Sequence, residues 1–156
     1  MRGRSLACIA LMLMAATACA QHVGGGRLAP GAVLIAAPAS PATSGQTVYV
    51  SLAGSDMSGS VTDVQTRLDA GTLKRLRCYV SAAPGSGQTV TLTVQTGACN
   101  TALSNTALSC VVSDTDQHAD DLLNGVAVTA GQCGAIKVTY SAGAQMSFPR
   151  AWVQLF

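Results

Sequence analysis

Short runs of alternating apolar and polar residues recur from Gln46 to the C-terminus, which is the pattern of strands buried on one face. In the first run Val48, Val50 and Leu52 fall on one side and polar residues on the other. Seven more runs follow, at residues 64–68, 76–80, 90–94, 110–113, 125–129, 136–140 and 151–155. Helical periodicity is confined to residues 120–124. The pattern predicts one all-β domain of eight strands over residues 46–156.

Eight antiparallel strands in about 110 residues most often form a two-sheet jelly roll, with an immunoglobulin-like sandwich as the alternative. The immunoglobulin pattern places a tryptophan between two cysteines. Here Trp152, the only tryptophan, follows every cysteine. We therefore expect an eight-stranded antiparallel jelly-roll sandwich.

Residues 1–20 have the features of an export signal. Arg2 and Arg4 precede an uncharged apolar stretch, residues 6–18, that is too short to span a bilayer but suits a signal peptide. Residues 18–20, Ala-Cys-Ala, fit cleavage before Gln21. Alternatively, residues 16–19 resemble a bacterial lipobox, in which Cys19 would be acylated. The protein is thus expected to be periplasmic, extracellular or lipid-anchored at the cell envelope, with both processing routes open.

Residues 21–45 are rich in Gly, Ala, Pro and Ser, which is typical of a linker or tether. Their one apolar run, residues 33–37, would be an added edge strand.

Four cysteines remain beyond the signal and its border: Cys78, Cys99, Cys110 and Cys133. An even set in an exported chain predicts two disulfides. Of the three connectivities, Cys99 with Cys110 is the most local, which leaves Cys78 with Cys133. The spacings lack the Cys-x-x-Cys pattern of zinc sites, so zinc is not expected.

The charge of the chain changes once the signal is removed. The whole sequence has a formal net charge of +2, but Arg2 and Arg4 belong to the signal, so the mature chain is formally neutral. No basic stripe remains beyond Lys74, Arg75 and Arg77. We therefore expect no nucleic-acid partner.

Several strand and turn segments resemble small jelly-roll domains of phage and environmental bacterial genomes, some of which are virion surface or fibre proteins. These segments are residues 49–52, 70–77, 81–87, 126–131 and 151–156. The turn before the strand at Ile136 is more distantly similar to trimeric jelly rolls of the complement and tumour-necrosis type. The resemblance covers residues 46–156 and implies a jelly-roll fold with a structural or surface role. The export signal, Cys78 and Cys133 depart from the family's usual phrasing.

Residues for catalysis are scarce. The mature chain holds His22, His118 and no Glu, and it lacks the Gly-x-Ser-x-Gly elbow of serine hydrolases, so no enzymatic activity is expected. One polar cluster alternates potential calcium ligands at Asp114, Asp116, His118 and Asp120. A solvated loop between strands is the competing interpretation. No other cofactor is expected.

Trp152 lies opposite Val153 and Leu155 in the last alternating run. Beside Phe148 and Phe156 it would form an exposed apolar patch, which favours contact with a partner. The sequence therefore predicts a non-enzymatic, exported structural, surface-display or adhesion module able to self-associate. The alternative is a lectin-like carbohydrate-binding module that uses Trp152, Tyr79 or the Asp-rich segment.

Overall fold

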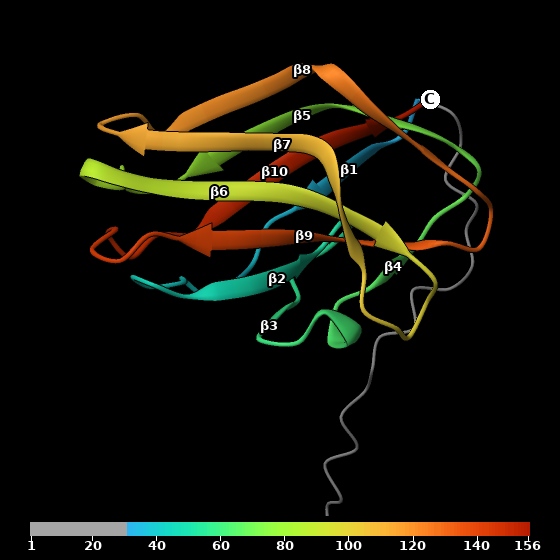
Figure 1. Cartoon of the computed structure of the whole chain (residues 1–156), viewed down its shortest axis with the longest axis horizontal. Coiled ribbons are helices and arrows are strands. Elements are labelled where there is room, and N and C mark those ends of the chain that lie inside the picture. Colours follow the sequence, from blue (N-terminus) through green and yellow to red (C-terminus); the bar gives the residue numbers. More distant parts are fainter. Residues whose placement is uncertain (1–30) are drawn as a thin grey trace, which may run out of the picture.

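The computed structural model describes residues 31–156 (Figure 1). The expected signal at residues 1–20, Cys19 and the linker up to residue 30 lie outside the described residues. The elements are β1 (Val33–Ala36), β2 (Thr47–Ser51), β3 (Met57–Ser58), a 3-10 turn η1 (Val61–Asp63), β4 (Thr66–Arg67), β5 (Gly71–Val80), β6 (Gly85–Gly97), β7 (Ser104–Asp114), β8 (His118–Val128), β9 (Cys133–Tyr140) and β10 (Pro149–Leu155). Within these residues the structure holds no helix with the length and apolar character needed to cross a membrane.

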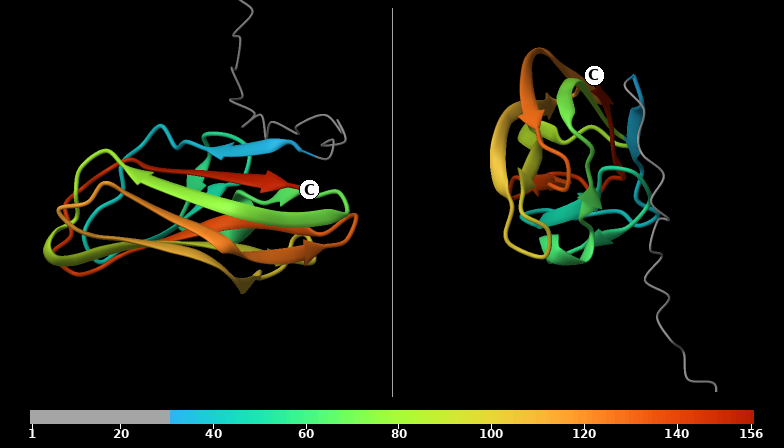
Figure 2. Two further views of the ribbon diagram at one scale, coloured as in Figure 1. Left: turned by 90° about the horizontal axis from the view of Figure 1, so that it is seen from above. Right: turned by 90° about the vertical axis from the view of Figure 1, so that its right-hand side faces the viewer.

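The strands form two sheets that pack face to face (Figure 2). One sheet has the order β1-β10-β5-β8, and the other has the order β3-β2-β9-β6-β7, with β4 added beside β9. Every ladder is antiparallel, and the first strand pairs with the last. This arrangement confirms the predicted all-β jelly-roll sandwich.

The core lies between the sheets because alternate residues of each strand point inward. In β10 the inward residues are Ala151, Val153 and Leu155, and all three are buried. In β6 they are Val90, Leu92 and Val94, which are buried in the same core. The apolar residues of the alternating runs in β6 and β10 are therefore the residues that form the core.

The domain begins earlier than the predicted boundary at residue 46. Strand β1 pairs in register with β10, where Leu34 lies opposite Val153, and Leu34 and Ala36 are buried. Ala42 is also buried and exchanges backbone hydrogen bonds with Ser147. The expected added edge strand is thus present, and part of the expected linker belongs to the core. The boundary was missed because β1 is only four residues long and is surrounded by Gly, Ala and Pro. Its alternation of apolar and polar residues is too short to identify it as part of the domain.

Two other predicted segments differ from the structure. The run at residues 64–68 contributes only the two-residue strand β4, which follows η1. Residues 120–124, which looked helical, belong to strand β8. Their apparent helical period comes from an interruption of β8 between Asp121 and Gly125.

All four predicted cysteines form disulfides, but the predicted pairing is wrong. The bonds join Cys78 to Cys110 and Cys99 to Cys133, with Cα–Cα distances of 6.5 and 4.9 Å. Cys110 lies six residues into the extended strand β7, which carries it about 20 Å from the strand's start and away from Cys99. Closeness in sequence therefore does not bring these two cysteines together.

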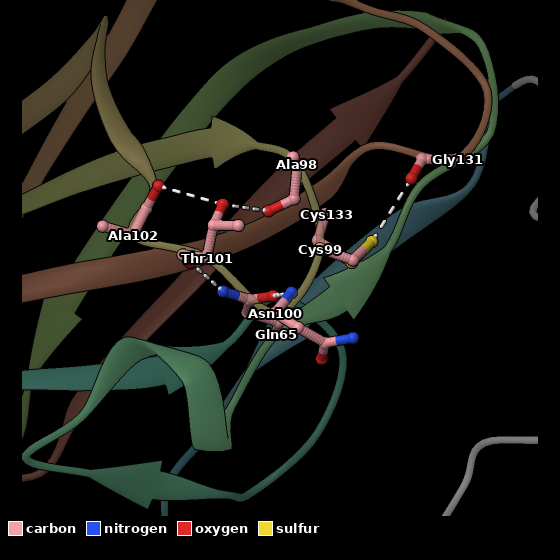
Figure 3. The surroundings of a disulfide bond; sticks show 8 residues. All are labelled: Gln65, Ala98, Cys99, Asn100, Thr101, Ala102, Gly131 and Cys133. Atoms are coloured by element: carbon pink, nitrogen blue, oxygen red, sulfur yellow. Dashed lines mark hydrogen bonds between the residues drawn. A yellow bond between two sulfur atoms is a disulfide. The ribbon is translucent and has the colours of Figure 1, made fainter.

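Each disulfide has a distinct place in the fold. Cys78 on β5 and Cys110 on β7 belong to different sheets, so their bond joins the two layers across the core. Cys133 begins β9 and lies opposite Gly97 on β6, which places it beside Cys99 (Figure 3). Around this second bond, Gln65 accepts a hydrogen bond from the Asn100 backbone N–H at 2.6 Å and donates one to the Thr101 carbonyl at 2.6 Å. The bond and these contacts together fix the β6–β7 connection.

Candidate functional site

The outward side chains of the β1-β10-β5-β8 sheet form a surface that we call the outer face. Because Ala151 and Val153 point into the core, Trp152 between them points outward and is only partly buried. The strand registers place Ile35 beside Trp152, Trp152 beside Arg77, and Arg77 beside Asp120. This row runs across all four strands of the sheet. It joins an aliphatic, an aromatic, a cationic and an anionic side chain.

A second row of outward side chains lies two residues away from the first along β10, β5 and β8. Arg150 on β10 is opposite Tyr79 on β5, and Tyr79 is opposite His118 on β8. Together the two rows place two aromatic rings and three basic side chains on the outer face.

The outer face is hollowed between these rows. The hollow has a volume of about 640 Å³, and its lining includes Val33, Arg77, Tyr79, His118, Asp120 and Trp152. Ligand-binding clefts commonly measure about 300 to 1,000 Å³, so the hollow is large enough to receive a bound group. Its walls combine apolar surface with basic and acidic groups.

A β-bulge in β5 brings a further cation to one side of the hollow. Arg75 has a φ of 57°, in the left-handed region that non-glycine residues rarely adopt. Its guanidinium donates a hydrogen bond to the side-chain oxygen of Gln154 at 3.2 Å and lies 5.2 Å from the centre of the Phe156 ring. The extra residue makes both Lys74 and Arg75 exposed, while Leu73 and Leu76 stay in the core.

Strand β8 is interrupted opposite this bulge. Lys74 pairs with Gly125 and Leu76 pairs with Asp121, so three residues of β8 face a single residue of β5. The Asp121 carboxylate accepts backbone hydrogen bonds from Leu123 at 3.3 Å, Asn124 at 3.1 Å and Ser109 at 3.0 Å. The Asn124 side-chain amide also donates to both carboxylate oxygens, at 3.2 and 3.0 Å. This carboxylate organises the interruption.

The same contacts set the charge of Asp121. Burial on its own would raise the pKa of this carboxyl group, but the hydrogen bonds from Asn124, Ser109 and Leu123 outweigh burial and hold the pKa below its ordinary value. Asp121 is therefore a buried carboxylate that stays ionised at neutral pH. Sequence reasoning missed it because its partner Ser109 lies on another strand, twelve residues away.

The interruption in β8 turns two leucines out of the protein. Leu122 is 52 % exposed and Leu123 is 98 % exposed. Sequence reasoning missed both as surface groups, since two adjacent apolar residues resemble part of a helical stripe. We call Leu122 and Leu123 the leucine knob.

The three aromatic residues predicted to form one patch lie apart. Phe148 precedes β10 and Phe156 follows it, so about 26 Å of extended chain separates them. Trp152 lies between them, with Ile35 and Arg77 as its cross-strand neighbours. The predicted outward direction of Trp152 is confirmed. The predicted joint patch is not formed, because seven strand residues keep the two phenylalanines at opposite ends.

The residues of the predicted calcium site are also spread along the chain. Asp114 ends β7 and accepts a hydrogen bond from the Gly87 backbone N–H at 2.7 Å, while Asp116 lies in the turn before β8. His118 and Asp120 are on β8 and contribute to the hollow. Residues 31–156 contain no group of three or more His, Cys, Asp or Glu side chains placed to hold a metal ion. Calcium binding at these residues stays a prediction.

No family model matches the sequence, and no curated protein matches it. Solved structures with similar backbones include murine APRIL, at 15 % sequence identity and a TM-score of 0.48, covering 79 % of this chain and 98 % of APRIL. Another is Eiger TNF from S. frugiperda, at 14 % identity and a TM-score of 0.42, covering 82 % of this chain and 94 % of Eiger. The resemblance to phage and environmental jelly rolls stays a prediction.

Proposed function

We propose that the protein is an exported, non-enzymatic structural or surface-display module that self-associates through its outer face. The observation that carries the proposal is the row in which the partly exposed Trp152 lies beside Ile35, itself 48 % exposed. Large apolar side chains that lie next to each other on a protein surface commonly mark a site of contact with another molecule. Two disulfides support the exported location, because such bonds persist in oxidising compartments.

The charged groups around Trp152 suit a specific contact. Protein interfaces combine a buried centre, often containing Trp, Tyr or Arg, with a polar rim. Trp152, Tyr79 and Arg77 are neighbours around the hollow and provide these three residue types. The outer face therefore has the composition of an interface centre.

Light scattering on the full mature chain, recorded over a range of concentrations, tests the proposal. We expect an assembly that dissociates in Trp152→Ala while the variant keeps the wild-type circular dichroism spectrum. Met146→Ala is the matched control, because Met146 is an exposed apolar residue in the β9–β10 connection. A wild-type protein that stays monomeric at every concentration would contradict self-association.

Carbohydrate binding is the second candidate, and the aromatic rings of the outer face favour it. Tyr79 and Trp152 both line the hollow, and so do Arg77 on β5 and Asp120 on β8, which offer hydrogen-bonding groups for hydroxyls. A glycan array decides between the candidates. A signal that disappears in both Trp152→Ala and Tyr79→Ala supports a lectin-like role, and the absence of any signal removes it.

A further inference from the structure

Two long strands, β7 and β8, form neighbouring edges of the two sheets (Figure 1). In the part of the chain that the structure describes, β8 pairs only with β5 and β7 pairs only with β6. Each of these edge strands has 11 residues, whereas β1 and β3, at the other ends of the two sheets, have only four and two. An edge strand presents unpaired backbone groups to strands of other molecules, and a long edge presents more of them.

Most of each long edge lacks charged side chains. Residues 104–113 of β7 contain neither a charged residue nor a proline, and the same holds for residues 122–128 of β8. Lysine and proline are residues that commonly protect sheet edges from pairing with other chains. Uncharged segments of high β propensity are the ones that pair between molecules when they are exposed. The side chains along these two edges therefore give little protection.

Both edge strands are interrupted, and we call residues 106–108 of β7 and 122–124 of β8 the edge interruptions. In each strand these three residues stand opposite a single residue of the neighbouring strand. The two edge interruptions are also connected. Ser109 directly follows the one in β7, Asp121 directly precedes the one in β8, and the Ser109 backbone N–H donates a hydrogen bond to the Asp121 carboxylate at 3.0 Å. One contact thus holds both edge interruptions at the same place in the sandwich.

Side-chain oxygens also fix each edge interruption from within. The Asp121 carboxylate accepts hydrogen bonds from two backbone N–H groups of residues 122–124, at 3.3 and 3.1 Å. In β7, the Thr106 hydroxyl donates to the Val94 carbonyl oxygen at 2.8 Å and accepts from the Leu108 backbone N–H at 3.2 Å. These backbone N–H groups are directed at side chains of the protein itself. The regular row of backbone groups is therefore broken within both edges.

We propose that the edge interruptions keep β7 and β8 from pairing with strands of other molecules. A strand that adds to a sheet needs a continuous row of backbone groups, and bulges and inward-pointing charges at an edge remove that continuity. In β8 the uninterrupted parts are only residues 118–121 and 125–128. The exposure of the leucine knob is then a result of the interruption. This inference does not depend on self-association through the outer face, because a contact between faces extends no sheet.

Deleting Leu122 and Leu123 tests the interruption in β8. The deletion leaves Asn124 alone opposite Arg75, so that one residue again faces one along the whole strand. We expect the variant to gain thioflavin T fluorescence and an intermolecular β band in its infrared spectrum, and we expect wild type to show neither. Leu122→Ser with Leu123→Ser keeps the interruption and should behave like wild type. A folded deletion variant without either signal would overturn the proposal, and so would a wild-type protein that shows them.

A second set of variants decides the matter even where the deletion variant does not fold. Asp121→Ala removes the acceptor that connects the edge interruptions, and Gly134→Ala overpacks the core on the inner strand β9. Both should lower the melting temperature, but only Asp121→Ala should gain thioflavin T fluorescence. Adding Leu123→Lys to Asp121→Ala should remove the fluorescence without restoring the melting temperature, because Leu123 is 98 % exposed and a lysine there protects the edge.

The outcomes of this set separate edge protection from general stability. If Gly134→Ala gains the same fluorescence as Asp121→Ala, loss of stability explains the pairing and the proposal is overturned. If Asp121→Ala gains none, or if Leu123→Lys fails to remove it, the edge interruptions do not protect the edge. Light scattering of the wild type, which tests self-association through the outer face, has no bearing on these results.

Discussion

The Asp121 carboxylate accepts a hydrogen bond from the backbone N–H of Ser109 at 3.0 Å, although the two residues lie on strands of different sheets. Strands β7 and β8 are neighbours along the chain, yet each pairs with strands of its own sheet in the described structure. The contact therefore links the two layers at the edge that carries the leucine knob. It complements the disulfide between Cys78 and Cys110, which links the same layers across the core.

Removing the Asp121 carboxylate should destabilise the fold. Asp121→Ala leaves three backbone N–H groups without their acceptor, and we expect a loss of about 1 to 3 kcal/mol in the free energy of unfolding. Urea denaturation measures the loss. Asp120→Ala, one residue away and exposed, is the control and should change stability by less than about 0.5 kcal/mol. Equal effects of the two changes would show that the carboxylate's contacts are not stabilising.

The same group should make stability depend on pH. The pKa of Asp121 is lower in the folded protein than its ordinary value near 3.9, so its contribution is fully present above that value. The contribution is lost as pH falls through the folded pKa, where the carboxyl group takes up a proton. In Asp121→Asn the side chain is neutral at every pH. The stability difference between wild type and Asp121→Asn, measured by urea denaturation, should therefore shrink between pH 6 and pH 2, and a constant difference would contradict this assignment.

The two disulfides should contribute equally to the free energy of unfolding. Their cysteines are separated by 32 and 34 residues, and the chain-entropy model gives about 4 kcal/mol for loops of that length. Cys78→Ser with Cys110→Ser should thus cost about as much as Cys99→Ser with Cys133→Ser in thermal unfolding. Proteolytic peptide mapping under non-reducing conditions checks the pairing directly. A peptide that links Cys99 to Cys110 would contradict the structure.

Gly134 should tolerate no side chain. A Cβ atom there would lie 2.5 Å from Leu52 Cδ1 and 3.2 Å from the Gln95 carbonyl oxygen. Because Leu52 is fully buried, Gly134→Ala should lower the free energy of unfolding by about 1 to 3 kcal/mol. Gly59→Ala is the matched control, since its Cβ would meet nothing within 4 Å. Equal melting temperatures for the two variants would show that the core around Gly134 rearranges without cost.

The sequence predicts the strands best where alternation is undisturbed. In β10 it correctly places Val153 and Leu155 in the core and Trp152 on the surface, because a period of two leaves each residue one face to occupy. The pattern fails at β8, where the interruption leaves both Leu122 and Leu123 on the surface and breaks the period of two. A bulge depends on contacts with other strands, and these are absent from a local pattern.

The candidate site was predicted only in part for the same reason. The alternation identifies Trp152 and Tyr79 as outward residues, but only the registers of β10 and β5 show that Arg77 lies beside Trp152. The disulfide pairing has a similar cause. Cys78 meets Cys110 because β5 and β7 lie across the core from one another, which follows from the order of strands in both sheets.

The two disulfides interleave along the chain, and this order has a consequence for biogenesis. A polypeptide that crosses a membrane N-terminus first presents Cys78, then Cys99, then Cys110 and finally Cys133 to the oxidising side. The earliest available partner of Cys78 is therefore Cys99, which is not its native partner. Strand β1 also cannot form its ladder early, because its partner β10 is the last strand to emerge. A chain exported in this order would complete its first sheet only after β10 has emerged, and a bond formed early between Cys78 and Cys99 would have to be exchanged before the native pairs can form.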